Sequence, residues 1–185
     1  MLLRSYDHTH AAELRELLLD VHGDCYAASE NRGAFDRRER FAWFVDHWSA
    51  MPGWSCVIGY DGEEATGFAY GAPLGPGSPW WSKVAGLDEK FTRETSTRTF
   101  AVSEVMVRPR WRKTGLSDQL HTALLDGRPE ERATLLVDIE HPKVQALYES
   151  WGYTSVGTTQ PFDDAPVMAA MIRPMIMHPA RPQND

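Results

Sequence analysis

The stretch "VRPRWRKTGLSDQLHTALL", from Val107 to Leu125, decides the fold. It follows "TFAVSEVMV", which alternates like a strand, and continues from Gly115 as an amphipathic helix. A strand-to-helix turn leaves backbone N–H groups unpaired, and the helix dipole adds about half a positive charge there. Gly115 leaves room for an anion, and four cations surround it: Arg108, Arg110, Arg112 and Lys113. We interpret the turn as a diphosphate-binding loop, although a charged surface turn fits the loop alone equally well.

The elements on either side of this stretch predict an α/β fold. Hydrophobic periodicity and turn signals predict strands at 1–6, 54–60, 65–74, 133–139, 153–159 and 165–175, and helices at 10–23, 36–51 and 142–151. Residues 75–98 have no clear period and are interpreted as an insertion. The order predicts one domain over 1–177, with a mixed sheet, and a flexible tail at 178–185.

The composition of the chain indicates some classes of protein and disfavours others. The chain has 185 residues, a net charge of -7 and 42% hydrophobic residues, which together predict one soluble globule and disfavour binding to nucleic acid. It has no apolar run long enough to cross a membrane and no signal-peptide pattern, so we expect a cytoplasmic protein. Cys25 and Cys56 are isolated, and the histidines are scattered, so neither a disulfide nor a metal site is expected.

Three segments resemble the GNAT superfamily of acyl-CoA-dependent N-acetyltransferases. "RKTGLS" (112–117) is similar to the family's Arg/Gln-x-x-Gly-x-Gly/Ala loop, with Ser117 at the last position. "FAVSEVMVRP" is similar to the strand that ends in Val-x-Pro. "HPKVQALYESWGY" is similar to the Asn-x-x-Ala-x-x-x-Tyr-x-x-x-Gly-Phe segment, with His141 in place of Asn and Tyr153 in place of Phe. The element order of the whole chain is compatible with the family.

The resemblance implies a mixed, largely antiparallel central sheet flanked by helices on both faces. It also implies acetyl-CoA as the acyl donor. In the family the loop holds the diphosphate, and the strand backbone runs along the pantetheine arm. The residues carried over are Val105, Met106, Val107, Arg112, Lys113, Thr114, Gly115, Leu116, Ser117 and His141.

Acyl transfer to an amine needs a base for the ammonium and a proton for the departing thiolate. Glu104 is our candidate base, because it is a carboxylate on an apolar strand, expected on one face with Phe100, Val102 and Met106. Asp138 is a weaker candidate. Tyr148 stands where the family has its proton donor. The alternatives are an ion-paired Glu104 and a core Tyr148.

The acceptor site in this fold is formed by the early helices, the loop between them and the last hairpin. We therefore expect the loop 24–36, Trp80, Trp81 and the segment 158–167, with Asp163 and Asp164, to meet a small-molecule amine. The alternative for the two tryptophans is a purely structural role. Other activities that fit are a non-catalytic CoA-binding module and acetylation of protein N-termini or lysines. The last strands often pair between subunits in this fold, which would make a homodimer.

Overall fold

The computed structural model describes residues 1–27 and 37–175, so part of the predicted acceptor loop and the tail 178–185 lie outside the described residues. Its centre is a seven-stranded sheet in the order β1-β2-β3-β4-β5-β7-β6. The strands are β1 (Leu2–Asp7), β2 (Ser55–Asp61), β3 (Glu64–Pro73), β4 (Thr99–Val107), β5 (Arg132–Asp138), β6 (Thr154–Thr159) and β7 (Met168–Pro174). All neighbours are antiparallel except β4 and β5, which confirms the mixed, largely antiparallel sheet.

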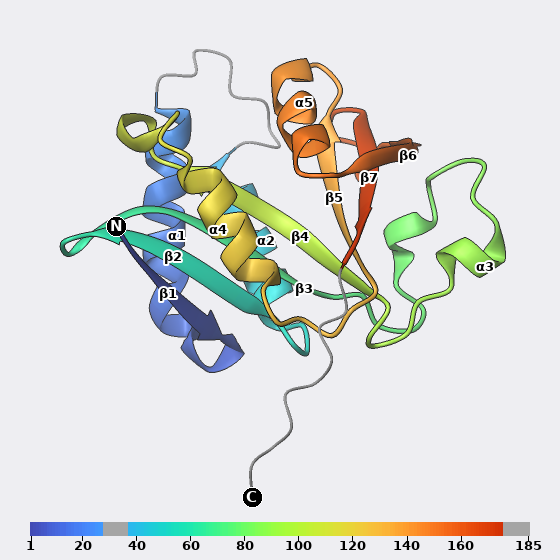
Figure 1. Cartoon of the computed structure of the whole chain (residues 1–185), viewed down its shortest axis with the longest axis horizontal. Coiled ribbons are helices and arrows are strands. Elements are labelled where there is room, and N and C mark those ends of the chain that lie inside the picture. Colours follow the sequence, from blue (N-terminus) through green and yellow to red (C-terminus); the bar gives the residue numbers. More distant parts are fainter. Residues whose placement is uncertain (28–36, 176–185) are drawn as a thin grey trace, which may run out of the picture.

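Helices cover both faces of the sheet, as expected (Figure 1). The helices α1 (Ala11–Tyr26) and α2 (Arg38–Ser49) pack on one face, and α4 (Leu116–Leu125) and α5 (Pro142–Ser150) on the other. Each apolar stripe recurs at helical spacing, so Leu14, Leu18 and Val21 are buried on α1, and Leu116, Leu120 and Leu124 on α4. Within the described ranges, no helix is both long and apolar enough to cross a bilayer.

The two central strands, β4 and β5, begin together and then diverge. They pair in parallel only at Thr99 with Arg132, Phe100 with Ala133 and Ala101 with Thr134. Beyond these pairs, β4 continues beside β3 and β5 continues beside β7. Figure 1 shows the two ribbons separating from their shared start. Among residues 1–27 and 37–175, no strand therefore covers the backbone edge on the β5 side along the later half of β4.

A β-bulge interrupts β4 where the strands separate. Tyr70 of β3 pairs with Glu104, whereas the next residue, Gly71, pairs with Val102. Ser103 is therefore an extra residue without an opposite partner on β3. A bulge of this kind bends its strand and re-aims the side chains that follow it.

Because of the bulge, our prediction that Glu104 shares one face of β4 with Phe100, Val102 and Met106 is wrong. Phe100 and Val102 pack in the core beneath α4, as inward residues of a strand should. Met106 packs instead in the core beneath α1 and α2, and Glu104 is paired with Tyr70, whose ring lies in that same core. The four residues do not share one face, because Ser103 shifts the alternation by one position.

The insertion after β3 contains the 3-10 turn η2 (Pro79–Trp81) and the short helix α3 (Glu89–Thr92). Its anchor is Glu94, whose side chain is 1% exposed and pairs with Arg132 at 3.0 Å. The same carboxylate oxygen accepts hydrogen bonds from the Trp81 indole at 2.6 Å and the Thr99 hydroxyl at 2.9 Å. This buried network fixes the insertion to the shared start of β4 and β5.

We predict that Arg132→Met lowers the free energy of unfolding by about 3 to 5 kcal/mol, because Glu94 would keep a buried charge without its partner. Adding Glu94→Leu should restore much of this loss, since neither charge is then buried. Urea unfolding of both variants and the wild type measures the effect. A single variant as stable as the wild type, or a double variant less stable than the single one, would contradict this account.

Candidate active site

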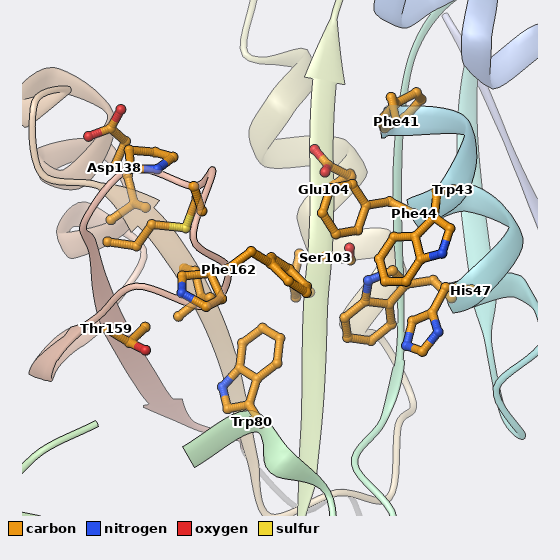
Figure 2. A pocket seen from close by; sticks show the side chains of 18 of the residues that line it. Phe41, Trp43, Phe44, His47, Trp80, Ser103, Glu104, Asp138, Thr159 and Phe162 are labelled. Atoms are coloured by element: carbon orange, nitrogen blue, oxygen red, sulfur yellow. The ribbon is translucent and has the colours of Figure 1, made fainter. Parts of the chain in front are cut away.

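A cavity of about 1010 Å³ lies beside the uncovered edge of β4. Residues of α2, the insertion, β4, β5, α5 and the loop between β6 and β7 line it. Figure 2 shows Glu104 and Ser103 on β4, with Asp138 on one side of the strand and the aromatic rings of α2 on the other. The cavity thus joins residues that are far apart in the sequence.

The two predicted catalytic side chains, Glu104 and Tyr148, both line this cavity. Burial raises the pKa of the Tyr148 phenol, and the negative charge of Glu104 raises it further. The same carboxylate also adds to the raised pKa of Tyr70, after burial as the main cause. Tyr148 therefore keeps its proton at neutral pH. Within the part of the chain that the structure describes, its hydroxyl makes no hydrogen bond, so the proton is available to a bound molecule.

An aromatic cluster holds the ring of Tyr148. Trp151 meets it edge to face at 5.3 Å between centroids, and Tyr153 at 6.0 Å. His121 of α4 stacks on Trp151 at 4.5 Å, and its Nε2 lies 2.9 Å from the Tyr153 hydroxyl. The contacts tie α5 to α4 and restrict the rotation of Tyr148.

Some cationic side chains of the loop after β4 are used within the protein and do not form part of an anion-binding site. The Arg108 side chain is only 11% exposed and pairs with Asp20 at 2.6 Å and with Asp24. Its Nε also donates to the Ala65 carbonyl at 2.7 Å. Arg108 therefore fastens α1 to the sheet, which corrects our interpretation of it as part of a phosphate-binding cluster.

Arg112 also has a structural task. Its guanidinium donates to the carbonyls of Val107 at 3.2 Å and Cys25 at 3.1 Å, so it joins the loop to the end of α1. Arg110 is largely exposed, and its guanidinium lies 4.9 Å from the Trp111 ring. Lys113 is exposed as well. The loop is thus shaped by its arginines and presents the charge of Lys113 to solvent.

The backbone of this loop has the form expected of an anion site. Gly115 precedes α4 with φ of 82°, and Lys113 has φ of 64°. A side chain at Gly115 would meet only Gln119 Nε2, at 3.9 Å, so the space in front of the glycine is open. Gly115 gives α4 no side-chain cap, and the first N–H groups of the helix face that space.

The neighbouring residues carried over from the family differ in exposure. The Thr114 hydroxyl donates to the Trp111 carbonyl at 2.7 Å, and Leu116 is buried in the core, so both shape the loop. Ser117 is half-buried on the first turn of α4. These side chains position the backbone rather than present a charge.

Side chains at the end of β4 point to two different faces of the sheet. Val105 and Val107 pack against the core beneath α4, whereas Met106 lines the cavity. His141 lines the cavity just before α5, and its Nδ1 lies 3.2 Å from Asp138. Asp138 also accepts the backbone N–H of Glu140 at 2.9 Å. Asp138 is therefore engaged locally, by His141 and by the backbone of Glu140.

The four residues that we predicted to contact a substrate do not all line the cavity. Trp80 lines the cavity, but Trp81 is 3% exposed and is not among the lining residues, because it donates to Glu94 beneath the insertion. Asp164 lines the cavity and pairs with Arg40 at 3.0 Å, so it already has a cation. Asp163 is exposed and does not line the cavity. Of the four residues, Trp80 and Asp164 therefore line the cavity, and Trp81 and Asp163 do not.

Sequence reasoning did not name the rings of α2 that line the cavity. Trp43, Phe44 and Trp48 line it, and none was named as a site residue, although the acceptor site was expected at the early helices. Phe162 also lines it and belongs to the segment 158–167, which was expected to line the acceptor site. The signal for Trp43 was present, because this large ring lies off the buried face of α2 and is 45% exposed. An exposed aromatic ring on an amphipathic helix is informative when it forms part of a larger apolar surface.

Comparisons with known proteins show the same fold. No family model matches the sequence, and no curated protein matches it. An aminoglycoside 6'-acetyltransferase type Ii structure is 18% identical, with a TM-score of 0.63 over 97% of this chain and 100% of that one. A GNAT-family acetyltransferase from Streptococcus pneumoniae is 14% identical, with a TM-score of 0.58 over 94% and 98%. A candidate acetyltransferase from Salmonella typhimurium with its cofactor acetyl-CoA is 16% identical, with a TM-score of 0.58 over 100% and 99%.

These likenesses extend over nearly the whole of each chain. The chain has the GNAT fold, which confirms the fold implied by the resemblance in its sequence.

Acidification should weaken the aromatic cluster. Burial, and secondly the charge of Arg173, lowers the pKa of His121 to about 4. Between about pH 6.5 and pH 4, His121 is therefore protonated in the unfolded state but neutral in the folded state. The free energy of unfolding is unaffected above this window, and it falls by up to about 3 kcal/mol as the pH decreases through it. Urea unfolding from pH 8 to pH 4 measures the loss. His121→Gln should lose less stability over this window, and equal slopes for both proteins would refute the assignment.

Proposed function

We propose that the protein is an N-acetyltransferase that moves the acetyl group of acetyl-CoA to the amine of a small molecule by direct attack on the thioester. The observation that carries the proposal is the meeting of Glu104 and Tyr148 in one cavity beside the uncovered edge of β4. An acid and a base that come from different elements and interact electrostatically have the arrangement that amine acylation requires.

The donor would lie along this edge and end at the loop before α4. The diphosphate fits the open space at Gly115, where the N–H groups of the first turn of α4 and the charge of Lys113 favour an anion. The uncovered backbone of Val105 to Val107 would hold the amide groups of the pantetheine arm, and a backbone N–H there would polarise the thioester carbonyl. His141, at the other side of the cavity, would contact the arm.

Glu104 would act on the acceptor. An alkylammonium has a pKa near 10, so only roughly one molecule in a thousand is neutral at pH 7. The Glu104 carboxylate, directly or through a water molecule, would take the ammonium proton and leave a lone pair on nitrogen. That lone pair forms the new bond to the acetyl carbon.

Tyr148 would act on the leaving group. As the C–S bond breaks, its electron pair stays on sulfur, and the resulting thiolate takes the phenolic proton. The raised pKa of Tyr148 ensures that the donor is protonated before the reaction. The nitrogen of the amine loses two protons in all, because it carries a second surplus proton once it has bonded to the acetyl carbon. The first goes to Glu104, and the second restores the Tyr148 phenol, directly or through water, after Tyr148 has protonated CoA. Glu104 then releases its proton to solvent, so each acetyl transfer from an ammonium releases one proton.

Tyr148→Phe tests this function. We expect it to lower kcat at least about tenfold with little change in affinity for acetyl-CoA, because the hydroxyl acts only in the transition state. The activity is measured as the release of the free thiol of CoA, which should require both acetyl-CoA and an amine. If the wild type binds acetyl-CoA but releases no thiol with any amine, a non-catalytic CoA-binding module becomes the better account. Full activity of the variant would remove Tyr148 from the mechanism.

Gly115→Asp tests the position of the diphosphate. We expect it to weaken acetyl-CoA binding about tenfold or more, because a carboxylate would face the phosphates at the positive end of α4. Gly115→Asn is the matched control, since it tolerates the same left-handed backbone and has nearly the same shape without the charge. Isothermal titration calorimetry compares the two. Equal affinities for the Asp and Asn variants would place the phosphates elsewhere.

A further inference from the structure

One wall of the cavity consists almost entirely of aromatic rings. We call it the aromatic wall; its members are Phe41, Trp43, Phe44, Trp48, Trp80 and Phe162. Four of them come from α2, one from the insertion and one from the loop between β6 and β7. Figure 2 shows the labelled rings of this wall gathered beside Ser103 and Glu104 of β4.

The rings hold one another in fixed orientations. Trp43 meets Phe162 edge to face at 5.9 Å between centroids, and Phe44 lies 5.6 Å from Phe162. Trp48 and Trp80 form a second edge-to-face pair at 5.9 Å. Such contacts leave ring faces and edges in defined directions, so the aromatic wall offers a rigid apolar surface to a flat molecule.

Arg40 lies against three rings of the aromatic wall and pairs with Asp164. Its guanidinium lies 5.1 Å from the rings of Trp43 and Phe44 and 4.7 Å from the ring of Phe162. It also pairs with Asp164 at 3.0 Å. The negative charge of Asp164 is therefore balanced by Arg40 and does not serve a substrate ammonium.

Among the lining residues that the structure describes, the other charges also disfavour a polycation. Asp138 is held by the His141 ring and the N–H of Glu140. Lys83 lines the cavity with a positive charge, and its Nζ donates to the Pro161 carbonyl at 3.0 Å. Glu104 is the carboxylate at the strand where the chemistry is proposed. A substrate with several ammonium groups needs several such carboxylates, because each cation otherwise loses hydration without compensation.

We infer that the acceptor is a monoamine with an aromatic body, such as an arylalkylamine, rather than a polyamine or an aminoglycoside. The inference rests on the proposed function, since it names the substrate class of the same site. The ring of the substrate packs on the aromatic wall, and its single amino group reaches toward Glu104. Apolar contact with the wall supplies affinity for the ring of the substrate.

A substrate panel at saturating acetyl-CoA tests the inference. We expect kcat/KM for 2-phenylethylamine and tryptamine to exceed that for spermidine, kanamycin and ethanolamine by about tenfold or more. Trp80→Ala and Phe162→Ala should each raise KM for the aromatic amines by about tenfold, with the KM for acetyl-CoA little changed. Leu2→Ala, at an exposed apolar residue of the edge strand β1, is the control and should behave as the wild type. The two wall variants come from different elements, so a folding defect in one of them does not decide the result.

The outcomes separate this inference from the proposed function. Turnover that is equal or faster with spermidine or kanamycin, or wall variants that leave the KM for aromatic amines unchanged, would overturn the inference alone. Calorimetric titration of 2-phenylethylamine into the protein with CoA provides a readout without turnover. Binding that is lost in Trp80→Ala, together with no acetyl transfer, would overturn the proposed function while supporting the aromatic site. Neither binding nor turnover would overturn both.

Discussion

The divergence of β4 and β5 is the constraint on which the rest of the structure depends. Three residue pairs join these strands, after which β4 remains with β3 and β5 with β7. A strand edge that loses its neighbour has backbone donors and acceptors that need other partners. Here the edge borders a cavity instead of a covering strand, so the fold itself supplies an extended row of polar backbone groups for a ligand. The buried network around Glu94 and Arg132 fixes the point from which the two strands separate.

The bulge at Ser103 turns the Glu104 side chain toward the cavity at that edge. Without the extra residue, Glu104 would share a face with Phe100 and Val102 and point into the core beneath α4. With it, the carboxylate lies in the cavity, close enough to raise the pKa of Tyr148 on α5. The bulge therefore places the proposed base on β4 in the same cavity as the proposed acid, Tyr148 of α5. The aromatic wall then surrounds the acceptor side of the same space.

Local pattern in the sequence was sufficient for the order of the elements and for the loop at Gly115, because periodicity and turn chemistry act over a few residues. It was insufficient for the bulge, since the run from Phe100 to Met106 reads as simple alternation. The signal was on the partner strand: a side chain at Gly71 would lie 2.2 Å from the Ala101 carbonyl oxygen, and a glycine inside a strand often marks a bulge. The pairing of Arg108 with α1 spans more than eighty residues of sequence. No local pattern contains such a contact, and the same holds for the pairing of Asp164 with Arg40.

A crystal structure of the protein with acetyl-CoA tests the central claim most directly, namely that the gap between β4 and β5 is the acyl-donor site. The account predicts the diphosphate at Lys113 to Ser117, the pantetheine arm along Val105 to Val107, and the acetyl group between Glu104 and Tyr148. Acetyl-CoA bound with its acetyl group outside this gap, or with its diphosphate away from the first turn of α4, would contradict it.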